Sequence, residues 1–194
     1  MGLLRAFIAS ELPSTLQETI QNAASPLRQA LRGDLVRWVP AHNIHLTLKF
    51  LGDVSPANLD LIKQMLVAEA EDFTPFDIQV EGLGCYPNSR RARVLWVGLK
   101  APPQLAALQR AIEAGAGRLG YESEDRNFSP HLTLGRVRQN ATAADLQIIR
   151  AALEDTRIGY LGGARVDAVH LFKSELRPEG SIYSRLFSAT LQKG

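Results

Sequence analysis

The sequence predicts an α+β fold of two lobes related by a pseudo-twofold axis, each an antiparallel sheet flanked by helices, with a central groove between them. The main observation is an internal repeat, because the tetrapeptide His-Leu-Thr-Leu occurs at residues 45–48 and again at 131–134. The order of expected strands and helices also repeats around the two copies. Hydrophobic residues form 45% of the 194-residue chain, which is enough to bury a sizeable core.

The repeat indicates one bilobal domain over residues 1–194 rather than two separate domains. Its halves extend over about 1–85 and 92–175. An alternating apolar run at 182–190 predicts a further C-terminal strand that pairs back on the sheet.

The first half is expected to run strand, helix, strand, helix, strand. Ser14 with Gln17 three residues later is typical of a capping box, and Pro26 should kink or split the helix that begins there. Ser55 followed by Pro56 marks the start of the next helix. The expected elements are a strand at 3–9, a helix from 14 to about 33, a strand at 44–51, a helix from 56 onward and a strand at 76–80.

The second half repeats this order. Apolar residues at helical spacing predict two helices, and Thr142 should cap the second of them. The expected elements are a strand at 94–99, a helix around 105–112, a strand at 132–137, a helix from 142 to about 153 and a strand around 166–172.

Composition limits the classes of function. The net charge of +2 permits an anionic substrate but is not typical of a protein that coats nucleic acid. Cys85 is the single cysteine, so neither an intramolecular disulfide nor a thiolate metal cluster can form. No apolar segment approaches the roughly 20 residues of a membrane helix, and the N-terminal apolar stretch is too short for a signal peptide. We expect a cytosolic monomer that does not enter a membrane.

Strand periodicity decides which motif residues face the same way. Side chains alternate along a strand, so His45 and Thr47 share one face while the leucines of the motif share the other. The same holds for His131 and Thr133. If the lobes face each other across the pseudo-twofold axis, the two His-x-Thr pairs converge on one cleft.

Two convergent histidines suit general acid–base chemistry. An imidazole has a pKa of about 6.5, so one ring can accept a proton while its twin donates one. Phosphodiester cleavage needs this division, because water is deprotonated on one side and the leaving alkoxide is protonated on the other. Hydroxyls of Thr47 and Thr133 can donate to the phosphate oxygens. Arg136 is a further candidate anion ligand, provided that the strand bends near Gly135, because plain alternation would point it away from His131.

These residues resemble a known family. The segments His45-Leu46-Thr47-Leu48-Lys49-Phe50-Leu51-Gly52 and Phe128-Ser129-Pro130-His131-Leu132-Thr133-Leu134-Gly135-Arg136 are similar to the paired motifs of the 2H phosphoesterase superfamily. More narrowly, they resemble the bacterial RNA 2′,3′-cyclic phosphodiesterases, also called 2′-5′ RNA ligases. The resemblance covers the whole chain.

The resemblance implies a LigT-like bilobal fold with an active-site groove, with His45 and His131 as catalytic residues and Thr47 and Thr133 as phosphate-binding residues. It implies hydrolysis of a terminal 2′,3′-cyclic phosphate on RNA to a 2′-phosphate, with reversible 2′-5′ ligation as a weaker activity. It also implies that no metal or other cofactor takes part.

Other residues have simpler interpretations. His42 lies at odd spacing from His45, so the two would face opposite ways on a strand, and a surface position is expected. His170 is interpreted as structural. Phe7 and Phe50 are possible stacking platforms for an RNA base, although an aromatic residue in such a place is more often part of the core. The basic segment at 90–93 could guide RNA as a loop, or simply be solvated.

Two other functions remain open at this level. A binding module could hold RNA ends or cyclic nucleotides in the same groove without turning them over. A phosphodiesterase could instead act on a small cyclic phosphate. Comparing cyclic mononucleotides with oligonucleotides that carry a cyclic phosphate would separate these alternatives, and rates with defined ends would decide whether ligation matters.

Overall fold

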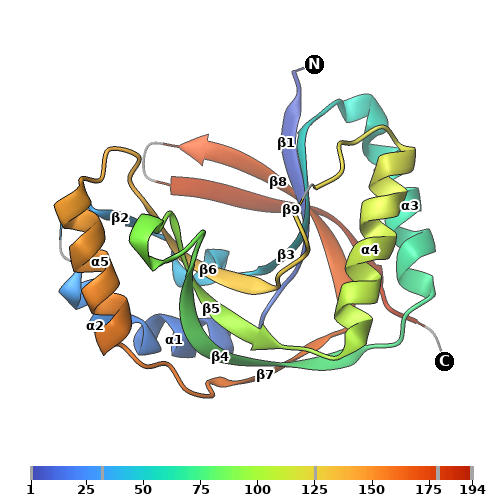
Figure 1. The fold of residues 1–194 in the computed structure, drawn as a ribbon. Helices are drawn as coiled ribbons and strands as arrows, with labels where there is room; N and C mark the ends of the chain where they lie inside the picture. Colours follow the sequence, from blue (N-terminus) through green and yellow to red (C-terminus); the bar gives the residue numbers. More distant parts are fainter. Residues whose placement is uncertain (1, 32, 125, 178–179, 193–194) are drawn as a thin grey trace.

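The computed structural model describes residues 2–31, 33–124, 126–177 and 180–192. Within these residues the chain forms one antiparallel nine-stranded sheet with helices packed around it (Figure 1). The strands are β1 Leu4–Ser10, β2 Val36–Trp38, β3 Leu46–Val54, β4 Phe76–Tyr86, β5 Val94–Lys100, β6 His131–Val137, β7 Gly162–Val166, β8 Ala168–Arg177 and β9 Gly180–Thr190. The α-helices are α1 Ser14–Ala23, α2 Ser25–Ala30, α3 Leu59–Glu71, α4 Pro103–Arg118 and α5 Ala143–Asp155. Short 3₁₀ helices are η1 Ala41–Asn43, η2 Pro56–Asn58 and η3 Ser89–Arg91.

The strand order is symmetric about the centre of the sheet. It runs β7-β4-β5-β6-β3-β1-β8-β9, and β2 pairs with β6 outside this path. The two motif strands β3 and β6 are therefore central neighbours, flanked by β1 and β5. The outer strands come from opposite halves of the chain, because β4 pairs with β5 and β8 pairs with β1. Each side of the sheet thus contains strands from both sequence halves.

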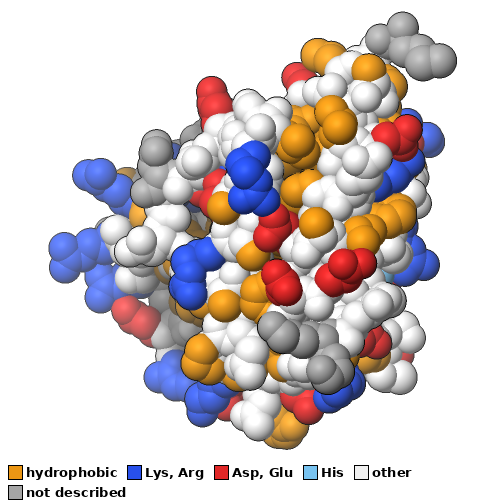
Figure 2. All heavy atoms as spheres, turned by 90° about the vertical axis from the view of Figure 1, so that its right-hand side faces the viewer, with side chains coloured by type: hydrophobic (Ala, Val, Ile, Leu, Met, Phe, Trp, Pro, Cys, Tyr) orange, Lys and Arg blue, Asp and Glu red, His pale blue; other side chains and the backbone are white. Residues whose placement is uncertain are grey.

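The helices divide between the two sides of the molecule. α3 and α4 pack together and contact β3, β8 and β9, whereas α1, α2 and α5 lie at the other side (Figure 1). Figure 2 views the α3 and α4 side, where apolar side chains and charged side chains of both signs are interspersed. Within the described residues, no helix is both long and apolar enough to cross a membrane.

Most local expectations are confirmed. The first predicted helix is split into α1 and α2 just before Pro26, and α5 begins with a capping box between Thr142 and Asp145. Ser55 caps η2, which leads directly into α3. β9 pairs back on β8 along its length, as the alternating apolar run predicted.

The capping box expected at Ser14 is wrong. Pro13 is the N-cap of α1, and no side chain bonds the cap. The Gln17 amide instead donates to the carbonyl of Ile44 at 2.8 Å, directly before the first motif. The tertiary contact therefore replaces the local one. The short strand β2 was also not predicted, because three residues give too little periodicity to detect.

Candidate active site

The two motifs meet at the centre of the sheet. His45 lies directly before β3, and His131 is the first residue of β6. Leu46 pairs with Leu132 in antiparallel register, and both side chains are fully buried. Continuing this register by one residue in each direction sets each motif histidine opposite the threonine of the other motif. The four polar side chains lie away from the buried leucines and are partly exposed, on what we call the catalytic face.

Both imidazoles are held in the same way. His45 Nδ1 lies 2.7 Å from the carbonyl oxygen of Asn43, and His131 Nδ1 lies 2.8 Å from that of Ser129. Because a carbonyl oxygen only accepts, Nδ1–H must be the donor in each case. This fixes the tautomer of the neutral ring and leaves Nε2 of each ring free to accept or donate a proton.

His45 is enclosed by aromatic rings. Phe7 stacks on its imidazole at a centroid distance of 4.8 Å, and Tyr183 of β9 approaches edge-on at 5.3 Å. The pKa of His45 is lowered to about 4, chiefly by burial; the hydrogen bond to the Asn43 carbonyl opposes this lowering, and the charges of Arg136 and His131 contribute to it. The free site therefore favours a neutral imidazole here at neutral pH.

His131 has a more open environment. Tyr86 approaches its ring edge-on at 5.0 Å, and the Tyr86 hydroxyl hydrogen-bonds the Ser129 hydroxyl at 2.7 Å. Burial lowers the pKa of His131 as well, the bond to the Ser129 carbonyl opposes this, and the charge of Arg136 adds to the lowering. Both rings therefore tend to be neutral before an anion binds.

A β-bulge turns Arg136 toward the site. Thr133 pairs with Trp96 and Gly135 pairs with Leu95, so Leu134 is the extra residue in β6. Leu134 is buried in the core while Arg136 is exposed, and the positive charge of Arg136 acts on both histidines. The bend that the sequence required near Gly135 is confirmed.

The first motif carries a bulge at the equivalent position. Thr47 pairs with Ala9 and Lys49 pairs with Ile8, which leaves Leu48 as the extra residue. Phe50 is therefore the counterpart of Arg136 in the other half. It is 53% exposed. The catalytic face thus presents a cation on one side and an open aromatic ring on the other.

Phe7 has the core position that was its alternative interpretation from the sequence, and it is not a stacking platform for a base. Phe7 is 3% exposed, and its ring stacks against both His45, at 4.8 Å, and Phe172, at 5.2 Å. These two rings leave no room for a base on Phe7. Its side chain supports the imidazole of His45 instead.

Comparison with known proteins places this arrangement in a family. A sequence model of the 2′-5′ RNA ligase superfamily matches residues 7–177. This chain belongs to that superfamily. Curated relatives named RNA 2′,3′-cyclic phosphodiesterase include those of Methanothermobacter thermautotrophicus, 34% identical over 93% of this chain and 95% of the relative, and Archaeoglobus fulgidus, 34% identical over 94% and 98%.

Solved structures agree with this 2H phosphoesterase assignment. The structure of TT0787 from Thermus thermophilus matches with a TM-score of 0.80 at 26% identity, over 97% of this chain and 98% of that one. Escherichia coli LigT in complex with 3′-AMP matches with a TM-score of 0.76 at 26% identity, over 98% and 99%. The α+β fold class predicted from the repeat and the family that the motif segments resemble are therefore confirmed.

The remaining predicted residues lie where simpler interpretations put them. His42 is exposed in η1, and His170 is buried, with Nδ1 2.8 Å from the Ser188 hydroxyl. Arg90 and Arg91 are exposed in η3, which the Asn88 side chain caps. Among the residues with described structure, no three His, Cys, Asp or Glu side chains form a group that could hold a metal.

Several residues around this 2H site were missed from the sequence. Asn43 and Ser129 lie two residues before each histidine, so aligning the two copies of the repeat could have indicated their matching roles. Tyr183 gave no signal, because β9 lies far from both motifs in the sequence. The burial of Lys49 also gave no signal in the sequence, because a lysine is far more often solvated.

Proposed function

We propose that this chain is an RNA 2′,3′-cyclic phosphodiesterase that opens a terminal cyclic phosphate to a 2′-phosphate. The observation that carries the proposal is the pair of imidazoles on one face, each with Nδ1–H bonded to a carbonyl and Nε2 free. The shared name of full-length relatives at 34% identity supports the substrate class.

Two proton transfers complete the proposed reaction. One neutral imidazole takes a proton from water through Nε2 as the water oxygen bonds to phosphorus. The bond from phosphorus to the 3′ oxygen breaks, and the second imidazole, protonated beforehand, gives its proton to that oxygen. The rings thus exchange protonation states, and water protons restore them. Ligation to a 2′-5′ bond follows the same course with the 5′-hydroxyl of a second RNA in place of water: its oxygen bonds to phosphorus, one imidazole takes its proton, and the 3′ oxygen leaves with the proton of the other.

The remaining polar groups stabilise the charge on phosphorus. Thr47 and Thr133 hydroxyls and the Arg136 guanidinium donate to the non-bridging oxygens, whose negative charge grows in the transition state. Phe50 is exposed on the same face and stacks on the base next to the cyclic phosphate. We propose that the reaction uses no metal ion, because the two histidines supply both proton transfers.

The working unit is proposed to be a monomer, since one chain contains both histidines. A cytosolic location fits the single cysteine, which forms no intramolecular disulfide. RNA with a cyclic phosphate end is the proposed partner.

The test is hydrolysis of a short RNA ending in a 2′,3′-cyclic phosphate, with identification of the product. Wild type should yield a 2′-phosphate, also in EDTA. His45→Ala and His131→Ala should each reduce kcat by at least a hundredfold, as loss of a general acid or base does. Wild type that binds the RNA without cleaving it would indicate a binding module. Faster turnover of cyclic mononucleotides than of RNA would indicate a small cyclic phosphate as substrate.

A further inference from the structure

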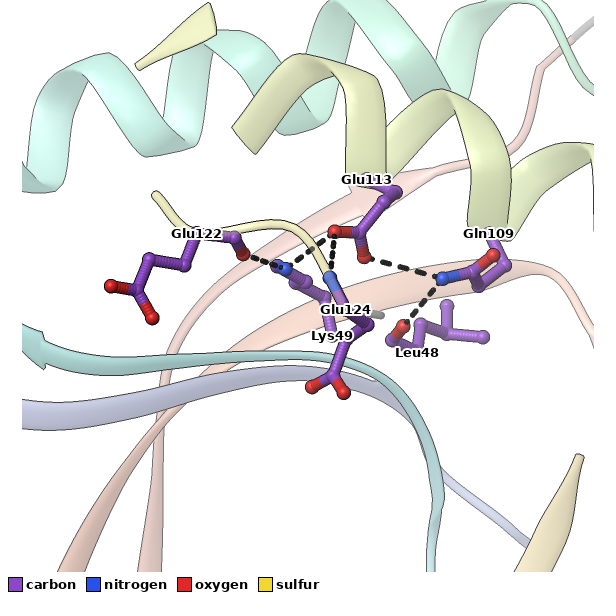
Figure 3. Close-up of polar contacts among 6 residues, drawn as sticks. All are labelled: Leu48, Lys49, Gln109, Glu113, Glu122 and Glu124. Atoms are coloured by element: carbon purple, nitrogen blue, oxygen red, sulfur yellow. Dashed lines mark hydrogen bonds and ion pairs between the residues drawn. The ribbon is translucent and has the colours of Figure 1, made fainter. Parts of the chain in front are cut away.

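A buried lysine lies in the first motif strand. Lys49 follows Thr47 by two residues and is 2% exposed. Its Nζ lies 2.6 Å from a carboxylate oxygen of Glu113 on α4 and 2.5 Å from the carbonyl oxygen of Glu122 (Figure 3). Burying an ammonium group removes its hydration at a high cost in free energy, so it is tolerated only with partners of this kind.

The bulge at Leu48 explains why this side chain points away from the catalytic face. Without the extra residue, strand alternation would put Lys49 on the same face as Thr47. The Gln109 amide lies 3.4 Å from the Leu48 carbonyl oxygen and 3.4 Å from Glu113 (Figure 3). α4 therefore contacts both the bulged residue and the lysine that follows it.

The same ion pair contacts the segment that leads to the second motif. Glu113 accepts a hydrogen bond from the backbone N–H of Glu124 at 3.0 Å, beside the Glu122 carbonyl held by Lys49. This segment connects α4 to β6 and leads to Ser129, whose carbonyl holds His131. One ion pair, between the buried Lys49 and the partly buried Glu113, thus contacts the strand of Thr47 and the approach to His131.

The second half of the chain has no counterpart to this contact within the described residues. Lys49 pairs with Ile8 directly after the Leu48 bulge, and Gly135 occupies the matching place after the Leu134 bulge. A Cβ on Gly135 would come within 2.6 Å of the Val36 side chain, so this space is filled by β2. The Lys49 pair therefore connects the two motifs from one side of the sheet.

A buried ion pair contributes little net stability, and replacement by neutral groups of similar shape is often neutral or stabilising. We propose that Lys49 and Glu113 are positioning residues, which fix the bulge of the first motif and the approach to the second so that both His-x-Thr pairs address one phosphate. The inference rests on the proposed function. It predicts that loss of the ion pair lowers kcat and leaves the stability of the fold nearly unchanged.

The test is the double variant Lys49→Met/Glu113→Gln, which removes both charges and keeps the side-chain lengths. On the cyclic-phosphate RNA, kcat should fall at least tenfold while KM changes less than threefold and Tm stays within a few degrees. The matched control is Arg118→Met/Glu69→Gln, which removes an ion pair between the same helix α4 and α3. The control should keep the wild-type kcat.

A folded double variant with wild-type kcat would overturn the inference, as would an equal loss in the control. If the double variant does not fold, Gln109→Met decides, because it removes only the amide that contacts the Leu48 carbonyl. It should lower kcat severalfold, and a wild-type kcat would overturn the inference. Wild type that does not hydrolyse the RNA end would overturn the proposed function itself, so the two failures are distinguishable.

Discussion

The two histidines differ in their surroundings although their motifs are identical. The imidazole of His45 is packed among aromatic rings, whereas that of His131 is more open beside Tyr86. Burial lowers the pKa of both, and for His45 to about 4. A bound phosphate anion acts in the opposite direction, because it favours the charged imidazolium. We therefore expect the substrate itself to favour the protonation state that the proposed mechanism requires, with one ring neutral and one charged.

This electrostatic arrangement predicts a difference between two pH profiles. The pH dependence of kcat/KM reports the ionisation of the free enzyme, in which the pKa values of both histidines are lowered. A plot of kcat/KM against pH should therefore be bell-shaped, with its maximum on the acid side of pH 6.5. The value of kcat reports the complex, so its maximum should lie at higher pH. Steady-state kinetics on cyclic-phosphate RNA between pH 4 and 9 measure both. A flat kcat/KM over this range would contradict the acid–base pair.

The lowered pKa of His45 also predicts a pH dependence of stability. A histidine buried in its neutral form gives stability that is present above the unfolded pKa of about 6.5 and is lost as the pH falls toward the folded pKa of about 4. Between pH 7 and 4.5 this loss is roughly 2 kcal/mol. Urea unfolding of wild type and of His45→Asn at pH 7 and pH 4.5 measures this. The free energy of unfolding should fall less between the two pH values in the variant than in wild type. An equal fall in the free energy of unfolding in both proteins would contradict the lowered pKa of His45.

Phe50 and Phe7 should respond in opposite ways to truncation. Phe50→Ala should raise KM for the RNA end, because the ring that stacks on the base is lost, while the free energy of unfolding changes by less than about 1 kcal/mol at this exposed position. Phe7→Ala should lower the free energy of unfolding by about 3–5 kcal/mol, because the ring is buried. Kinetics and urea unfolding of both variants test this, and an unchanged KM in Phe50→Ala would remove Phe50 from the substrate site.

At the scale of elements, the paired bulges in β3 and β6 determine what the catalytic face presents. Each extra leucine shifts the alternation of its strand, so that the exposed residue is Phe50 in one strand and Arg136 in the other. Gly135 directly follows the extra leucine of the second bulge. A glycine is needed there, because a side chain would collide with Val36 of β2. We therefore expect substrate orientation to depend on these backbone irregularities, since the two His-x-Thr motifs are identical in sequence.

The requirement for glycine at 135 is testable. Gly135→Ala should lower the free energy of unfolding by about 1–3 kcal/mol through overpacking against β2. It should also reduce kcat, because Arg136 moves with the strand. Gly117→Ala on α4 is the control, since its Cβ would meet nothing within 4 Å and alanine favours a helix. Urea unfolding and steady-state kinetics of both variants measure these effects. A Gly135→Ala protein as stable and active as wild type would contradict the close packing of residue 135 against Val36.

At the scale of the whole molecule, the two sequence halves exchange strands. β4 of the first half pairs with β5, and β8 of the second half pairs with β1. α4 of the second half likewise packs against β3. Neither half can therefore complete its sheet or bury its apolar face alone, although each carries one full motif.

This exchange predicts that fragments 1–88 and 89–194 do not fold separately. Each should lack a cooperative unfolding transition and activity, and mixing them should restore both in part, because the missing strand partners are supplied in trans. Circular dichroism with urea and the RNA cleavage assay measure this. Cooperative unfolding of either fragment alone would show that the halves are independent units.

The repeat made much of the site predictable, because an identical His-x-Thr unit in two matching places has no simple packing explanation. The same repeat gave the strand and helix order, and the split at Pro26 and the cap at Thr142 followed from local chemistry. Other features could not be predicted in this way. The Ser14 cap failed because Gln17 bonds the Ile44 carbonyl in the folded chain, and a sequence pattern does not contain that partner.

The sequence by itself determined the pair of histidines, the threonines beside them and the alternation that separates polar from buried side chains, because these depend on local spacing. Only the tertiary structure decided which strands pair across the halves, which ring encloses His45, and that Lys49 lies beneath the sheet while Phe50 lies on its catalytic face. The physical reason is that a bulge and a strand exchange are stabilised by contacts between residues far apart in the chain, which period and composition do not specify.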